Sequence, residues 1–190
     1  MKHETWVVLL RGINVGGKNK LPMKELVALL ETLGFVDIKT YIQSGNVVFR
    51  GPKGTPSKLA TTIASAIEEA FDFRPNVIAL TKENFEKAAA ANPFPDAEAA
   101  QDGKTLHAFF LEEAPRKVDA ACLDAVKIPS ERWHVIGSVF YLHAPEGFGT
   151  SKLATKAERC LGVSATARNW RTVGELLKLA EYHASYHREL

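Results

Sequence analysis

The pentapeptide SKLAT occurs twice in this chain, at residues 57–61 and again at residues 151–155, an offset of 152 − 58 = 94 positions. Both copies follow a loop rich in glycine and proline, and each loop follows the second strand of a predicted hairpin. The same letters at the same place in the same order of elements indicate an internal duplication. One irregular α+β domain is the alternative interpretation.

The elements around each copy alternate in a recognisable order. The β-branched stretch 5–13 predicts a buried strand, Pro22 suits the first turn of a helix, and Gly34 suits its C-terminal end. The remaining elements of the first half are strands at 36–42, 47–50 and 76–80 and a helix at 59–70. This βαββαβ order is the ferredoxin-like motif, so we predict an α+β fold of two tandem ferredoxin-like subdomains.

We expect the first subdomain over residues 1–80, a linking helix and loop over 81–103, and the second subdomain over 104–190. Thr81 suits the N-terminal cap of the linking helix, and the polar stretch 96–104 is the best boundary. The second half is predicted to hold strands at 105–111, 132–136, 139–143 and 163–167, and helices at 117–126, 152–161 and 172–185.

Composition narrows the class of protein. The chain has 190 residues, 46% hydrophobic and 24% charged, with a net charge of +2, which is typical of a globular protein. No apolar run reaches the roughly 18–20 residues that span a bilayer, and no signal peptide is evident, so we expect a soluble cytoplasmic protein without membrane association. Cys122 and Cys160 lie in separate helix-like segments, so neither a disulfide framework nor a zinc site is expected.

Polar residues converge at one edge of the first subdomain. In a ferredoxin-like unit the loop after the first strand, the turn at 43–46 and the loop at 72–74 share that edge. Residues 1–24 carry five basic side chains and one acidic side chain, a local charge of 5 − 1 = +4. Glycine amides and cations suit an anion. The predicted ligand-binding residues here are Arg11, Asn14, Gly16, Gly17, Lys18, Gln43, Ser44 and Asn46. The alternative interpretation is two ordinary turns with solvated lysines.

The same loop contains a near match to a phosphate-binding P-loop. Residues 12–18 fit the pattern G-x-x-x-x-G-K, but Asn19 follows where the motif needs the hydroxyl of Ser or Thr for magnesium. Pro22 also places the helix start too late for its amides to hold a β-phosphate. The sequence therefore argues against a P-loop nucleoside triphosphatase.

A second polar cluster precedes the last predicted helix. Its candidate ligand-binding residues are Arg168, Asn169, Trp170 and Arg171, and the topology places them beside the loop at 146–152. Residues 147–178 carry six basic and two acidic side chains, a charge of 6 − 2 = +4. The alternative is a core tryptophan surrounded by solvated arginines. The sequence leaves open whether the two clusters share one groove.

Histidines and carboxylates give no catalytic pattern. His183 and His187 are four residues apart but lack the glutamate of H-E-x-x-H and a third ligand, so no metal site is expected. His107, His134 and His143 lie on predicted strands without a nucleophile beside them. Catalytic residues therefore stay unassigned.

Four stretches carry a family resemblance: Leu9–Met23 (LLRGINVGGKNKLPM), Tyr41–Phe49 (YIQSGNVVF), the helix start at Ser151–Leu153 and Arg168–Val173 (RNWRTV). Together they resemble the bacterial domain-of-unknown-function family sixteen ninety-seven over nearly the whole chain. The resemblance implies an α+β fold of two subdomains and no established activity, substrate or cofactor.

The leading hypothesis is a protein that binds an anionic ligand: a phosphorylated metabolite, a nucleotide or a nucleic acid. An enzyme acting on a small phosphorylated or acidic substrate is one alternative, although the motif loops contain no His, Cys, Glu or Asp. A protein-interaction module that pairs through an edge strand is the other. No cofactor is expected, and the oligomeric state is left open.

Overall fold

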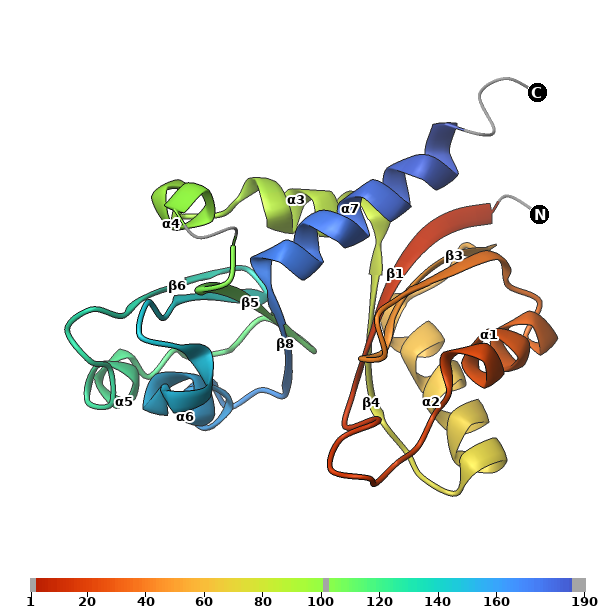
Figure 1. Cartoon of the computed structure of the whole chain (residues 1–190), viewed down its shortest axis with the longest axis horizontal. Helices are drawn as coiled ribbons and strands as arrows, with labels where there is room; N and C mark the ends of the chain where they lie inside the picture. The colour runs from red at the N-terminus through yellow and green to blue at the C-terminus, as the bar shows by residue number, and fades with distance from the viewer. Residues whose placement is uncertain (1–2, 101–102, 186–190) are drawn as a thin grey trace. The chain divides into compact units, whose positions relative to one another are not determined.

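The structure is a computed structural model that describes residues 3–100 and 103–185 (Figure 1). The chain divides into two compact units. Unit 1 comprises the residues up to Lys87 together with those from Glu175 onward, and unit 2 comprises Ala88–Gly174. No helix in the described part of the chain is both long enough and apolar enough to cross a membrane.

Unit 1 contains the predicted βαββαβ order. The elements are β1 (His3–Arg11), α1 (Met23–Thr32), β2 (Val36–Tyr41), β3 (Asn46–Pro52), α2 (Pro56–Phe71) and β4 (Asn76–Thr81), followed by α3 (Lys82–Ala90). Its antiparallel sheet has the strand order β2-β3-β1-β4, so the first strand is central. This is the order of a ferredoxin-like sheet and confirms the predicted fold.

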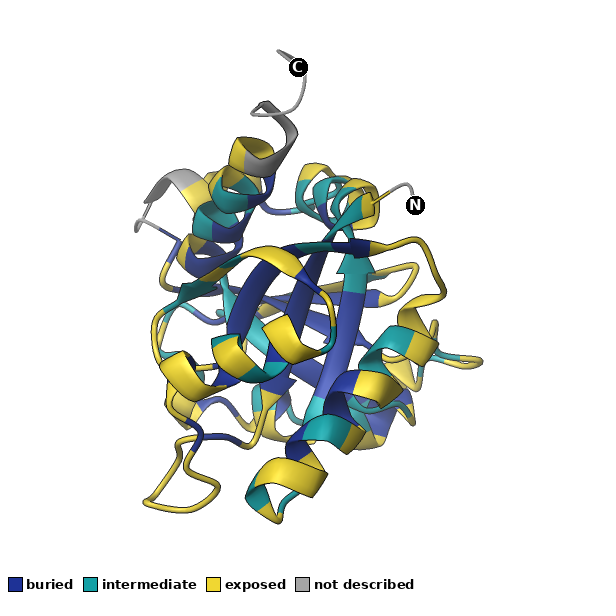
Figure 2. Ribbon diagram, turned by 90° about the vertical axis from the view of Figure 1, so that its right-hand side faces the viewer, coloured by how far each residue is buried: buried dark blue, intermediate teal, exposed yellow. Residues whose placement is uncertain are grey.

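The core of unit 1 follows from the alternation of β1. Trp6, Val8 and Leu10 point to one face of the sheet and pack with apolar residues of α1 and α2. Val7 and Leu9 point to the opposite face and are also buried. Figure 2 shows these central strands as buried and the outer surfaces of the helices as exposed. Burial on both faces explains why β1 is a continuous apolar run.

Unit 2 repeats the topology. Its elements are α4 (Pro95–Ala100), β5 (Leu106–Leu111), α5 (Ala120–Asp124), β6 (Arg132–Ile136), β7 (Val139–His143), a 3₁₀ turn η1 (Phe148–Thr150), α6 (Lys152–Leu161) and β8 (Ala165–Asn169). The sheet order is β6-β7-β5-β8, which matches unit 1 strand for strand. α7 (Trp170–Ser185) follows β8. Each half of the chain therefore has the ferredoxin-like order of elements, as predicted.

The subdomain boundaries differ from the expected ones. The stretch 96–104, predicted as a polar boundary, begins with the helix α4, because Pro95 at a helix start and the alanines after it favour a helix. The Asn92 side chain precedes it and accepts a hydrogen bond from the Phe94 amide at 2.9 Å. Residues from Glu175 onward group with unit 1 instead of with the second subdomain. The predicted helix at 117–126 shortens to the five residues of α5.

The repeated SKLAT letters do not occupy equivalent helix positions. Ser151 is the N-terminal cap of α6, and its Oγ accepts a hydrogen bond from the Ala154 amide at 2.9 Å. In the first copy the cap is Thr55, which makes no side-chain cap hydrogen bond, and Ser57 lies inside α2. The shared topology thus supports the duplication more firmly than the shared letters do.

The cysteine prediction was wrong. Cys122 of α5 and Cys160 of α6 form a disulfide, with their Cα atoms 5.6 Å apart. Both helices of a βαββαβ unit pack on the same face of its sheet, so two helices distant in sequence become neighbours. Residue spacing alone does not reveal such a long-range pair.

Candidate functional site

The strand register of unit 1 brings the predicted loops to one edge. Leu9 of β1 and Tyr41 of β2 both pair with Asn46 of β3, and Arg11 pairs with Asn76 at the start of β4. The loop at 12–21, the turn at 42–45 and the segment before β4 therefore share this edge, as the topology predicted. We call the loop at 11–21 together with the turn at 42–46 the motif edge.

Asn14 closes the loop and attaches it to the turn. Its Nδ2 donates hydrogen bonds to the carbonyl oxygens of Leu21 at 2.9 Å and Gln43 at 3.0 Å, and its Oδ1 accepts one from the Leu21 amide at 2.8 Å. Its φ of 55° lies in the left-handed region that asparagine tolerates better than most residues. The predicted ligand-binding amide of Asn14 is thus engaged in holding the motif edge together.

Asn19 supplies a second closure. Its Nδ2 donates to the Gly12 carbonyl oxygen at 2.7 Å, and its own carbonyl oxygen accepts from the Asn14 amide at 3.0 Å. Asn19 stands where a P-loop would have a Ser or Thr, and here its side chain shapes the loop. The loop has an ordered conformation although it contains no regular secondary structure.

The tip of the loop is a tight turn made by two glycines. The Lys18 amide donates to the Val15 carbonyl oxygen at 3.1 Å, and Gly16 and Gly17 have φ values of 58° and 76°. Positive φ at both central positions defines a type I′ turn, which strongly favours glycine or asparagine. Both glycines are exposed, and Val15 beside them is 69% exposed. The turn therefore presents backbone amides and the Lys18 side chain to the outside.

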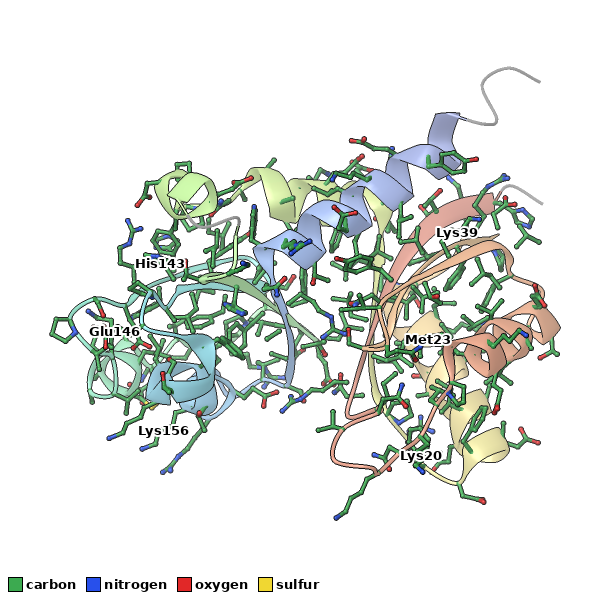
Figure 3. All side chains as sticks on the ribbon, viewed as in Figure 1. Lys20, Met23, Lys39, His143, Glu146 and Lys156 are labelled. Carbon is green, nitrogen blue, oxygen red and sulfur yellow. A yellow bond between two sulfur atoms is a disulfide. The ribbon has the colours of Figure 1, made fainter. Side chains whose placement is uncertain are left out.

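The cations of this loop are exposed. Arg11, Lys18 and Lys20 are all classed as exposed, and Figure 3 shows Lys20 on the loop between β1 and α1. Among residues 3–100 and 103–185, neither Lys18 nor Lys20 takes part in an ion pair. Their charge is therefore available to an anion.

The hairpin turn is partly exposed and partly buried. Gln43 and Ser44 are exposed, whereas Asn46 is fully buried and its Nδ2 donates to the Tyr41 carbonyl oxygen at 3.1 Å and to Ser44 Oγ at 2.8 Å. Gly45 is also buried, and the Leu10 amide donates to its carbonyl oxygen at 2.8 Å. Asn46 thus stabilises the turn, and Gln43 and Ser44 are exposed polar residues within it.

The second predicted cluster lies at the junction of β8 and α7 in unit 2. Asn169 Oδ1 accepts a hydrogen bond from the Thr172 amide at 2.9 Å and so caps α7. Trp170 is buried, with its ring centroid 6.3 Å from that of Tyr141. These contacts support the core interpretation of Trp170. Arg171 is exposed, while burial lowers the pKa of Arg168 to about 10, which leaves it cationic at neutral pH.

A buried histidine lies beside this junction. His107 of β5 pairs with Asn169 of β8, and its ring stacks on Phe148 with centroids 3.9 Å apart. Burial lowers the pKa of His107 to about 4, so the ring is neutral at pH 7. Its Nδ1 has no hydrogen-bond partner within the described residues. His107 thus contacts both Phe148 of the 146–152 loop and Asn169 of the second cluster, so this loop and this cluster lie close together, as the topology predicted.

Two side-chain arrangements were not predicted from the sequence. One is the disulfide between Cys122 and Cys160. The other is Arg132 of β6, which binds the Asp96 carboxylate of α4 (Nη2–Oδ2 2.6 Å), lies 4.8 Å above the Phe94 ring and contacts His143 Nδ1. The hydrogen bond from Arg132 lowers the pKa of Asp96, and burial lowers the pKa of His143. Both arrangements join residues distant in sequence, so no local pattern signals them.

Metal-binding groups are not assembled in the described part of the chain, where no cluster of three or more His, Cys, Asp or Glu side chains occurs. His134 and His143 lie on the hairpin strands as predicted. His183 and His187, at which no metal site was expected, fall outside the side chains that the structure describes.

Comparison with known proteins identifies the family and the fold. The chain resembles the structure of a conserved bacterial protein from Streptococcus pneumoniae with a TM-score of 0.70 and 22% identity, covering 94% of this chain and 99% of that one. No curated protein matches the chain. A family model described as protein of unknown function (DUF1697) matches residues 3–141, which include the first two motifs and end before Arg168. The chain therefore belongs to the DUF1697 family of proteins of unknown function, as its LLRGINVGGKNKLPM and YIQSGNVVF stretches indicated.

Proposed function

We propose that this protein binds a phosphate-bearing ligand at the motif edge of unit 1. One observation carries the proposal: a hydrogen-bonded loop presents two exposed glycine amides beside Lys18 and Lys20, neither of which has an ion pair among the described residues. Phosphate oxygens accept hydrogen bonds from such amides and gain further from charged donors.

The rigidity of the loop supports binding. Asn14 and Asn19 together make five hydrogen bonds that close the loop or attach it to the turn, so its amides need little ordering when a ligand arrives. Gln43, whose carbonyl oxygen is one of the acceptors, thereby stays beside the loop. Gln43 and Ser44 would read the uncharged polar groups of the ligand.

Titration calorimetry with inorganic pyrophosphate, with ATP and with a single-stranded oligonucleotide tests the proposal. We expect the double variant Lys18→Gln/Lys20→Gln to lose at least about tenfold in affinity, since one hydrogen bond to a charged group already contributes about 1.5–3 kcal/mol. The matched control is Lys58→Gln/Lys87→Gln, which removes the same charge from exposed helix positions of unit 1. Equal weakening in both variants would show that only net charge matters and would refute the site.

Salt dependence separates the ligand classes. A nucleic acid that contacts several phosphates loses affinity steeply with salt, by about 0.7–0.9 log units per contact for each log unit of salt. A nucleotide or phosphorylated metabolite at this edge gives a shallow slope. Absence of binding by all three probes would overturn the proposal.

The predicted cytoplasmic location stays a prediction.

A further inference from the structure

The connection between β5 and β6 contains the least regular part of unit 2. Residues 112–131 link the two strands and contain only the five-residue helix α5, whereas the corresponding α1 of unit 1 has ten residues. A single helical turn is not stable by itself in water. The position of α5 must therefore be maintained by its contacts with the rest of unit 2.

Few contacts hold α5 in place. Leu123 is fully buried in the core of unit 2, and Asp119 caps the helix by accepting a hydrogen bond from the Cys122 amide at 2.9 Å. Asp124 Oδ1 accepts a hydrogen bond from Trp133 Nε1 at 2.9 Å. The Asp119 amide donates to the Cys160 carbonyl oxygen of α6 at 3.3 Å, a weak bond. The covalent bond to Cys160 is the strongest link in this set.

The two cysteines differ in accessibility. Cys160 is 4% exposed and packs in the core cluster of unit 2. Cys122 is partly exposed, and its neighbours Asp119, Ala120 and Ala121 are exposed. An attacking thiolate therefore reaches the Cys122 sulfur more readily than the Cys160 sulfur.

We propose that Cys122 and Cys160 are a reversible thiol–disulfide site that fastens α5 to α6 when oxidised and releases the 112–131 segment when reduced. The reductant is a dithiol. Its thiolate attacks the Cys122 sulfur, the bond to Cys160 breaks, and Cys160 leaves as a thiolate that takes a proton from water. The second thiol of the dithiol then attacks the mixed disulfide, releases Cys122 as a thiol and leaves a cyclic disulfide. Two electrons and two protons pass to the protein.

The structural consequence is local. Reduction leaves α5 held by the packing of Leu123, Val118 and Val126, one cap and two hydrogen bonds, without the covalent link, so this segment opens more often. Val118 and Val126, which pack against the core cluster from the same segment, would become exposed with it. The sheet and α6 keep their own hydrogen bonds and remain folded.

Hydrogen exchange followed by mass spectrometry tests this on the full-length protein. We expect dithiothreitol to speed exchange in residues 112–131 by about tenfold or more, while α1 and α2 of unit 1 stay unchanged. Oxidised glutathione should then restore the original rates. Iodoacetamide added to the native, reduced protein should label Cys122. Unchanged exchange after reduction, or a disulfide that resists reduction until the protein unfolds, would overturn the proposal.

The variant Cys122→Ala should reproduce the reduced profile under oxidising conditions, because it removes only a partly exposed sulfur. Ala121→Ser on the same turn is the matched control, and it should keep the oxidised profile and its response to dithiothreitol. Cys160→Ala is less informative, since it also leaves a cavity in the core. A C122A profile equal to that of the oxidised wild type would also count against the proposal.

Discussion

At the residue scale, the motif edge is defined by side chains that build the loop as well as by side chains that face outward. The side chains of Asn14, Asn19 and Asn46 donate hydrogen bonds to the loop and turn backbone, whereas those of Lys18, Lys20 and Gln43 are exposed and make no hydrogen bond within the described residues. A sequence pattern does not separate these two roles, because both use polar residues in the same stretch. The expected set of binding residues therefore contained structural ones.

Gly45 allows a direct test of the close packing under this edge. A Cβ at Gly45 would lie 2.6 Å from Leu10 Cβ, and its φ of 72° disfavours any side chain. We expect Gly45→Ala to lower the free energy of unfolding by about 2–4 kcal/mol, combining a clash with left-handed strain. Gly54→Ala is the control, because a Cβ there meets nothing within 4 Å. Thermal unfolding by circular dichroism measures both, and equal melting temperatures would contradict the packing.

At the element scale, most of the fold follows from local patterns. The hairpin strands at 132–136 and 139–143 and the helix at 152–161 coincide with β6, β7 and α6, because alternation and turn residues are local signals. The short α5 and the disulfide were not predicted, since both depend on packing against α6. α4 was also missed, although Pro95 followed by acidic residues and alanines is itself a helix-start signal.

The two SKLAT copies give a matched pair of helix-cap variants. Ser151→Ala removes the hydrogen bond from the Ala154 amide at the start of α6, and we expect a loss of about 1 kcal/mol in the free energy of unfolding. Ser57→Ala changes the same letter at an exposed position inside α2, so it should leave stability within about 0.5 kcal/mol of wild type. Urea unfolding compares the two. Losses of equal size would mean that the copies occupy equivalent helix positions after all.

At the scale of the whole molecule, charge is distributed unevenly in the sequence. Lys and Arg minus Asp and Glu give 12 − 9 = +3 over residues 1–95 and 12 − 13 = −1 over residues 96–190. The small total of +2 therefore conceals a basic first half, which carries the motif edge. Local charge is thus more informative about function here than net charge.

Stability of the molecule should fall on mild acidification. The folded pKa of His107 is about 4, below the ordinary value of 6.5, so between these values the unfolded chain binds a proton that the folded chain excludes. Protonation of His107 in the unfolded chain therefore lowers the free energy of unfolding at pH 4 by at most about 3 kcal/mol relative to neutral pH. Burial also lowers the pKa of His143, which adds a loss of the same sign.

Urea unfolding of wild type and His107→Gln at neutral pH and near pH 4.5 measures this effect. We expect the variant to lose less stability between the two pH values than wild type does. His143→Gln, on a more exposed strand position, is the control and should retain most of the pH dependence. A His107 ring that titrates near pH 6.5 by NMR in the folded protein would rule the mechanism out.

The division of α7 between the units has a consequence for how the chain completes its fold during synthesis. Unit 2 is contained in one uninterrupted stretch, Ala88–Gly174, while unit 1 draws on both the residues up to Lys87 and those from Glu175 onward. All of unit 2 is therefore synthesised before unit 1 has its last segment. Although its residues are made first, the N-terminal half is the part of the molecule that must wait, and unit 2 is the half that can finish first.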